Sequence, residues 1–237
     1  MISTRKLCFC YLNGPAIEFA DVDVPQGGVL LLSGASGSGK STWLALCAGL
    51  LQATSGSITV AGQPMADLSK TASDAWRAKT IGFLPQKLHL SAALSVQENL
   101  ELAQWAAGQK KNSAAINAAL AALDVQALAT RKPSELSGGQ AQRVALARAV
   151  LLAPKVILAD EPTASLDDGS ASAALSLLQT TAERLNATLV IATHDLRVKK
   201  HLEASFRPFL GIKLACSPIN TGASSYKNSS EKDDLRA

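Results

Sequence analysis

The sequence predicts an α/β fold with a mostly parallel central sheet, an antiparallel β part near the N-terminus and an inserted helical lobe. Three short runs, "VLLLS", "VILAD" and "TLVIAT", are apolar on both faces, as is typical of parallel strands that helices cover on each side. The stretch "AIEFADVDV" alternates with a period of two, which is typical of a half-buried antiparallel strand. Between Gln86 and Lys155 a helical pattern replaces the strand pattern.

Local signals place these elements along the chain. "PQGG" supplies a turn from the alternating strand into "VLLLS". The lobe is predicted over about residues 87–154. Its first helix begins at a capping box formed by Ser95 and Glu98 and ends at Gly108, and two alanine-rich helices follow. The sequence therefore predicts a helical insertion between two strands of the central sheet.

Composition limits the number of domains and the class of protein. The chain has 237 residues, 47% of them hydrophobic, which is enough for one substantial core. We predict a single domain over residues 1–215, followed by a polar, disordered tail over 216–237. The net charge is only +4 and the basic residues are scattered, so no nucleic-acid surface is indicated. Four cysteines without zinc or disulfide spacing, and no signal peptide or membrane span, indicate a cytosolic protein.

The strongest chemical signal is "GASGSGKS", which follows one predicted parallel strand and precedes a helix. Its glycines let backbone N–H groups approach phosphate oxygens, Lys40 reaches the outer phosphates, and the Ser41 hydroxyl can ligate Mg²⁺. A glycine-rich turn with a surface lysine is the alternative, which the strand and helix on either side disfavour. The predicted phosphate-binding residues are Gly34, Ala35, Ser36, Gly37, Ser38, Gly39, Lys40, Ser41 and Thr42.

Three titratable residues stand at the ends of the other two parallel strands. Asp160 ends "VILAD", where a second Mg²⁺ contact is expected in a nucleotide site, and Glu161 follows it. Glu161 is either a solvated charge or the general base for an attacking water, and the neighbouring metal-binding aspartate favours the base. His194 ends "TLVIATH" at the same edge of the sheet. A lone histidine is usually structural, but this placement favours a functional one.

A second candidate anion site opens the helix in "SELSGGQAQRVALARAV". A helix that starts on Ser137, Gly138 and Gly139 presents backbone N–H groups and the positive end of its dipole to an anion. The chain therefore carries two features that can bind phosphate, well separated in the sequence.

Together these motifs resemble the ATP-binding subunit of an ATP-binding cassette (ABC) transporter. The resemblance rests on the phosphate loop, "LSGGQ", "VILADEP", "SLD", "THD" and a glutamine after a strand, and it covers nearly the whole chain. It implies a P-loop NTPase core that binds ATP and Mg²⁺. It also implies that Tyr11 stacks on adenine, that Gln86 contacts Mg²⁺ and the attacking water, and that His194 contacts the γ-phosphate.

The same resemblance implies that two chains pair head to tail. Asp167 would belong to a loop that crosses between the subunits. The residues that would close on the γ-phosphate held by the other chain are Ser137, Gly138, Gly139 and Gln140. The residues that would act in hydrolysis are Lys40, Gln86, Glu161 and His194. The resemblance thus implies a homodimer, or a pair with a second cassette, that ATP closes and hydrolysis releases.

The implied role is to power an integral membrane subunit from the cytoplasmic face, and the nearest group is that of lipoprotein release, macrolide export and cell division. The segment "KLHLSAALSVQENL" would dock a short helix of that subunit through some of its leucines and His89, with core packing as the alternative for the leucines. Two other functions stay open: an ABC ATPase that drives a membrane regulator without transport, and one associated with nucleic acid. The transported substrate is not encoded here, because the membrane partner selects it.

Overall fold

Two β-sheets organise the described residues, 1–12, 14–164, 166–205 and 209–214, of the computed structural model. The parallel sheet has the strand order β10-β4-β9-β8-β7, and the antiparallel sheet has the order β2-β1-β5-β6, with β3 also paired to β1. The parallel strands are β4 (Val29–Ser33), β7 (Ile81–Leu84), β8 (Val156–Asp160), β9 (Thr188–Thr193) and β10 (Phe209–Lys213). The antiparallel strands are β1 (Ile2–Cys10), β2 (Ala16–Glu18), β3 (Val22–Val24), β5 (Ser55–Val60) and β6 (Gln63–Pro64). This arrangement confirms the predicted fold class.

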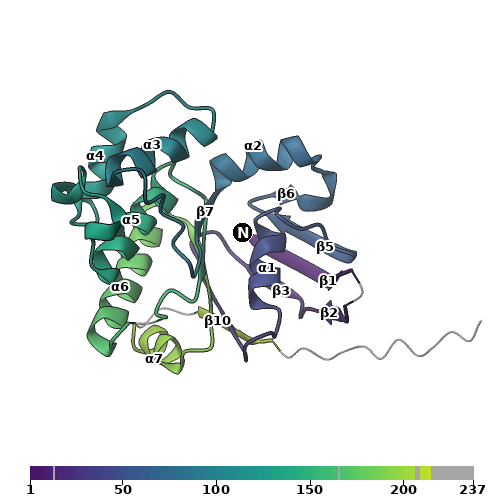
Figure 1. Ribbon diagram of the computed structural model, residues 1–237. Coiled ribbons are helices and arrows are strands. Elements are labelled where there is room, and N and C mark those ends of the chain that lie inside the picture. Colours follow the sequence, from purple (N-terminus) through teal and green to yellow (C-terminus); the bar gives the residue numbers. More distant parts are fainter. Residues whose placement is uncertain (13, 165, 206–208, 215–237) are drawn as a thin grey trace, which may run out of the picture.

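Helices cover both faces of the parallel sheet. They are α1 (Lys40–Cys47), α2 (Lys70–Thr80), α3 (Val96–Ala106), α4 (Ser113–Ala121), α5 (Gly138–Val150), α6 (Asp168–Arg184) and α7 (Leu196–Ala204). Figure 1 shows α5, α6 and α7 on one side of the sheet, and α1 with the antiparallel sheet on the other. In β4, Leu31 joins the core on the α5–α7 side, whereas Leu30 and Leu32 join the core around α1. Each apolar run is therefore buried on both faces, as its sequence predicts.

The alternating segment near the N-terminus forms two short strands, so the prediction of one strand was wrong, while the predicted antiparallel pairing was correct. The physical reason lies in β1, whose register with β5 shifts between Arg5 and Cys8. β3 pairs with the first half of β1 and β2 with the second half. Between the two halves the carboxylate of Asp21 accepts the Lys6 backbone N–H at 2.6 Å and replaces a bond of the ladder.

A helical region lies between β7 and β8, which are neighbours in the parallel sheet. The Ser95–Glu98 capping box opens α3 as expected, and Gly108, with a φ of 68°, follows its end. α3, α4 and α5 pack on one another around Leu100, Ile116 and Val144, all fully buried. Three 3₁₀ turns accompany the described helices: η1 (Met65–Asp67), η2 (Gln126–Leu128) and η3 (Pro133–Glu135).

The leucines after Gln86 divide between core and surface. Leu100 is fully buried and Leu88 and Leu90 pack against the same core, so core packing accounts for these three. Leu94 instead lines a groove beside α3, together with Leu102 and Trp105, which are exposed. None of the helices in the described part of the chain is both long and apolar enough to cross a membrane. The predicted tail over 216–237 lies outside the described residues.

Candidate nucleotide-binding site

The phosphate loop connects β4 to α1 and ends in a backbone conformation that favours glycine. Gly39 has a φ of 89° and stands at the N-cap of α1, where it offers no side-chain hydrogen bond to cap the helix. The uncapped N–H groups of α1 and the positive end of its dipole are available to an anion. A Cβ at Gly34 would lie 2.5 Å from the Ser38 Oγ atom and 2.7 Å from the Leu214 carbonyl oxygen, so a larger residue does not fit there. The loop therefore has the close-packed backbone that a phosphate cradle needs.

Lys40 places a buried cation over this loop. Its side chain is only 6% exposed, and its Nζ atom donates to the carbonyl oxygens of Gly34 at 2.9 Å and Ala35 at 3.0 Å. The same Nζ atom lies 3.7 Å from the Oε1 atom of Glu161. A cation held mainly by neutral carbonyls can exchange them for the stronger acceptors of a phosphate.

Ser41 and Asp160 form an oxygen pair at the carboxyl end of β8. The Ser41 hydroxyl donates to the Asp160 Oδ2 atom at 2.8 Å, while the Oδ1 atom is buried without a hydrogen-bond partner. Burial raises the pKa of the Asp160 carboxyl, the Ser41 hydrogen bond opposes this, the charge of Glu161 raises it further and Lys40 lowers it. A buried carboxylate oxygen without a partner fits Mg²⁺, which takes one or two carboxylates and completes its shell with water and substrate phosphates.

Glu161 follows directly and is held in a fixed orientation. Its φ is 49°, a conformation that costs a non-glycine residue free energy and that clusters at functional sites. The Oε2 atom accepts from the Thr193 hydroxyl at 2.7 Å, and the Oε1 atom lies 2.8 Å from the Nδ1 atom of His194. The Glu161 side chain is 10% exposed, whereas that of His194 is 64% exposed. β8 and β9 are adjacent and parallel, so their carboxyl ends bring both residues to one sheet edge.

A cavity of about 370 Å³ joins most of the predicted residues, a size in the range of ligand pockets. Tyr11 stands at its margin, with its hydroxyl 2.8 Å from the Thr42 Oγ1 atom and its ring edge-on to Phe9. The residues that line the cavity are Tyr11, Ile17, Ser36, Gly37, Gly39, Lys40, Ser41, Thr42, Gln86, Glu161 and His194. The phosphate loop, both strand ends, Gln86 and Tyr11 are thus brought together.

The second anion site lies apart from this cavity. Ser137 caps α5: its Oγ atom accepts the Gln140 N–H at 3.3 Å, and the Gln140 side chain accepts the Ser137 N–H at 2.9 Å. Asp167 caps α6 in a similar way, accepting the N–H and the hydroxyl of Ser170, which lowers the pKa of its carboxyl. Among the residues that the structure describes, the cavity lining includes neither cap. One chain therefore leaves "LSGGQ" and Asp167 outside its own phosphate site.

Two residues near the site, Thr193 and Arg148, are not among the predicted site residues. Thr193 holds Glu161, and it could have been found because a hydroxyl directly precedes His194 at the end of an apolar strand. Arg148 donates from α5 to the carbonyl oxygens of Leu88 and His89 at 2.6 Å and 2.7 Å. Burial lowers the pKa of its guanidinium, whose hydrogen-bond partners among the described residues are these two neutral carbonyls. The helix that begins at "LSGGQ" is thus bonded to the segment that follows Gln86.

Comparison with known proteins agrees with this geometry. The family model described as "ABC transporter" matches residues 17–164. The chain is 35% identical over 213 residues to the lipoprotein-releasing system ATP-binding protein LolD of Chromohalobacter salexigens, covering 87% of this chain and 90% of that protein. It is 39% identical over 209 residues to LolD of Pseudoalteromonas translucida, covering 85% and 90%.

Solved structures show the same likeness. The dimeric, post-hydrolysis structure of the ATP-binding cassette MJ0796 bound to ADP and Pi has a TM-score of 0.75 and 31% identity, over 85% of this chain and 91% of that one. The structure of cbiO1 from Clostridium perfringens, part of the ABC transporter complex cbiONQ, has a TM-score of 0.73 and 29% identity, over 82% and 78%. The chain therefore belongs to the ABC transporter family as an ATP-binding, ATP-hydrolysing subunit, with relatives in the predicted lipoprotein-release group.

Proposed function

We propose that this chain hydrolyses ATP within a dimer that closes around two nucleotides, and that this closure powers an integral membrane subunit. The observation that carries the proposal is the separation of two anion-binding features within one chain. The cavity is lined by Lys40 and by the carboxylate of Glu161, whereas Ser137 begins a helix that does not reach it. A second copy, placed head to tail, would bring its helix end to the γ-phosphate and complete each cavity.

Within each cavity the residues divide the work. Lys40 binds the β- and γ-phosphates, and Tyr11 stacks on adenine. Ser41, Gln86 and Asp160 hold Mg²⁺, which offsets phosphate charge when it is bound. Glu161 takes the proton of the attacking water, with its Oε2 atom steadied by the Thr193 hydroxyl. His194, which is exposed and lies beside Glu161, contacts the γ-phosphate.

The dimer is tested with Glu161→Gln, which keeps the size of the side chain and removes the base. We expect the variant to bind Mg²⁺ and ATP and to lose about 10² to 10⁴ of the hydrolysis rate, because general-base catalysis contributes about that much. Gel filtration with ATP should then show a long-lived dimer, while the same variant without nucleotide elutes as a monomer. A monomer in the presence of saturating ATP contradicts the shared-site proposal.

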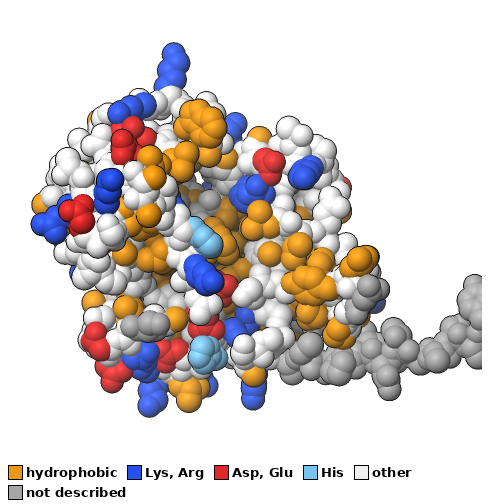
Figure 2. Space-filling view, in the orientation of Figure 1, with side chains coloured by type: hydrophobic (Ala, Val, Ile, Leu, Met, Phe, Trp, Pro, Cys, Tyr) orange, Lys and Arg blue, Asp and Glu red, His pale blue; other side chains and the backbone are white. Residues whose placement is uncertain are grey.

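The groove beside α3 supports a membrane partner. Trp105 is 75% exposed and Leu102 is 44% exposed, and both line the groove with Leu94. Figure 2 shows hydrophobic side chains exposed over this part of the helical region. Apolar anchors of a short amphipathic helix fit such a groove, which supports the proposal that the chain is held at the cytoplasmic face of the membrane by its partner. The family and the named relatives favour this partner over nucleic acid.

Trp105→Asp tests the partner. Because the indole is mostly exposed, the variant should fold and keep its basal ATP turnover, but it should no longer co-purify with an integral membrane protein from a mild detergent extract. Leu196→Asp is the matched control, since Leu196 is 73% exposed on α7, away from the groove. Equal recovery of the membrane protein with Trp105→Asp and with the control would show that the docking surface lies elsewhere.

A further inference from the structure

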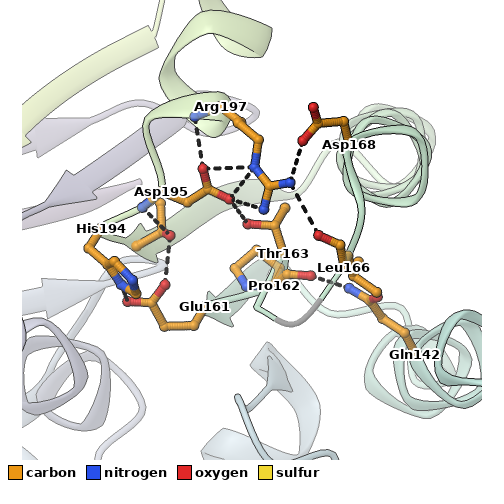
Figure 3. Close-up of polar contacts among 10 residues, drawn as sticks. Gln142, Glu161, Pro162, Thr163, Leu166, Asp168, His194, Asp195 and Arg197 are labelled. Atoms are coloured by element: carbon orange, nitrogen blue, oxygen red, sulfur yellow. Dashed lines mark hydrogen bonds and ion pairs between the residues drawn. The ribbon is translucent and has the colours of Figure 1, made fainter.

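The loop that leaves β8 toward α6 is fixed at three points by side chains from other elements (Figure 3). At its beginning, the Gln142 side chain on α5 donates to the Pro162 carbonyl oxygen. At its middle, the Thr163 hydroxyl donates to the Asp195 Oδ2 atom at 2.7 Å. At its far end, Arg197 on α7 donates to the Leu166 carbonyl oxygen at 3.1 Å. The loop begins at the carboxylate of the candidate base and ends at the cap of α6.

Arg197 makes one of these three contacts directly and supports a second one through Asp195. Its Nε atom donates to both carboxylate oxygens of Asp195, at 3.0 Å and 2.9 Å, and its Nη2 atom lies 2.8 Å from the Asp195 Oδ2 atom. The Nη1 atom bonds Leu166 and also the Asp168 Oδ1 atom, at 2.7 Å. A single guanidinium therefore sets the orientation of the carboxylate that holds Thr163 and pins the end of the loop. Only a planar, forked donor can serve all these acceptors at once.

The same network reaches the reacting residues. Asp195 follows His194, and its backbone N–H donates to the Thr193 hydroxyl at 3.0 Å. That hydroxyl in turn donates to the Glu161 Oε2 atom at 2.7 Å. Arg197 touches neither Glu161 nor His194, so any influence on hydrolysis passes through Asp195 and the loop. Isolated exposed ion pairs contribute little, but this one is bidentate and belongs to a network.

We propose that Arg197 is a positioning residue for ATP hydrolysis: through Asp195 and Leu166 it holds the described parts of the loop, residues 162–164 and 166–167, against the end of β9, so that Glu161 and Asp167 keep one fixed arrangement. The inference rests on the proposed function. We call the contacts of Arg197 with Asp195 and Leu166 the clamp. The clamp fixes the groups around the γ-phosphate and does not contact the phosphate loop that binds the nucleotide. It should therefore affect kcat and leave nucleotide affinity unchanged.

Arg197→Gln tests the clamp in the full-length protein. We expect kcat for ATP to fall about tenfold, with KM and the dissociation constant of a fluorescent ATP analogue within about twofold, because small misplacements of catalytic groups can cost up to about 10²-fold in rate. Amide hydrogen exchange should accelerate in the loop and stay unchanged in the interior of α6. Arg197→Lys should recover part of the rate, since a lysine keeps the charge without the fork.

Two further variants make the test specific. Asp168→Asn weakens the contact between Arg197 and Asp168 and leaves the ion pair between Arg197 and Asp195 in place. It should therefore lower kcat less than Arg197→Gln does. Lys199→Gln, the control, removes a charge from the same helix at an exposed pair with Glu203 and should change neither rate nor exchange. If the wild-type protein is active and Arg197→Gln has the same kcat, the inference is overturned. It is also overturned if Arg197→Gln loses nucleotide affinity as much as it loses rate. A wild-type protein without ATPase activity would overturn the proposed function itself.

Discussion

The two helix N-termini that can bind phosphate differ in how complete they are. At α1, no side chain caps the first turn, and a buried lysine and a carboxylate oxygen without a partner stand beside the loop. At α5, Ser137 and Gln140 cap each other, and α5 has no acidic residue in its first turn. The uncapped helix end of α1 and the buried carboxylate oxygen without a partner lower the stability of the fold, and a bound ligand can offset that loss. At α5, the capping box already gives hydrogen-bond partners to the backbone N–H groups of Ser137 and Gln140. In the proposed dimer, α1 would bind the nucleotide first, and α5 would contact it only when a second subunit closes.

The largest expected effect concerns the first site. Lys40→Ala removes the cation whose Nζ atom lies over the loop, bonded to Gly34 and Ala35. We expect tight nucleotide binding to be lost, since hydrogen bonds to charged groups contribute about 1.5 to 3 kcal/mol each and Lys40 would bind more than one phosphate in the proposed site. A filter-binding assay with labelled ATP measures this, with Lys79→Ala on α2 as a control at a basic residue outside the cavity. Unchanged affinity would refute the assignment of the phosphate loop.

The second effect tests the N-terminus of α5, which is capped by Ser137 and Gln140. Ser137→Ala and Ser95→Ala each remove the serine of a capping box, in α5 and α3 respectively, and each should cost about 1 kcal/mol of folding stability. Only Ser137→Ala should also lower ATP turnover, by about tenfold or more, because in the proposed dimer its hydroxyl and helix end would face the γ-phosphate held by the partner. Steady-state ATPase rates and urea midpoints, measured on both variants, separate stability from catalysis. Equal rates in the two variants would remove α5 from the active site.

Much of this contrast is predictable from the sequence. The apolar runs of β4, β8 and β9 predict buried parallel strands, and parallel strands bring Asp160 and His194 to the same edge of the sheet, whereas the strand order comes only from the structure. Spacing also predicts the phosphate loop, because its glycines, Lys40 and Ser41 act at fixed positions within one short stretch of chain. The capping boxes at Ser95 and Ser137 are equally local signals, and both are present.

The remainder depends on contacts that pattern does not encode. The break between β2 and β3 follows from a register shift in β1 and one side-chain bond from Asp21 to the Lys6 backbone N–H. The division of the leucines between core and groove depends on how α3 packs. Arg197 is an ordinary charged residue on a helix until the fold places it opposite Leu166, 31 positions earlier in the chain. Long-range hydrogen bonds of this kind require the tertiary structure.

The smallest expected effect concerns the loop between β8 and α6. This loop links the two sites, because it starts at Glu161 and is bonded to α5 through Gln142. The Arg197 guanidinium lowers the pKa of Asp195 from 3.8 to about 2, with burial opposing it and the Thr163 hydroxyl assisting. A carboxyl whose pKa is lower in the folded state stabilises the fold above its unfolded pKa, and this contribution is lost as the pH falls toward the folded pKa. The wild-type protein should therefore be more stable than Arg197→Gln near neutral pH.

That difference in stability should shrink from about pH 5 to about pH 3, where the unfolded carboxyl takes up a proton while the folded one is still ionised. Urea midpoints of both proteins across this range measure it. Lys199→Gln serves as the reference, because it removes the same charge from α7 without touching Asp195, so its difference from the wild-type protein should not follow the same titration. A gap between the wild-type protein and Arg197→Gln that stays constant down to about pH 3 would mean that Arg197 does not lower the pKa of Asp195 in solution. The loop would then be held by Gln142 and Thr163 without help from the Arg197–Asp195 charge pair.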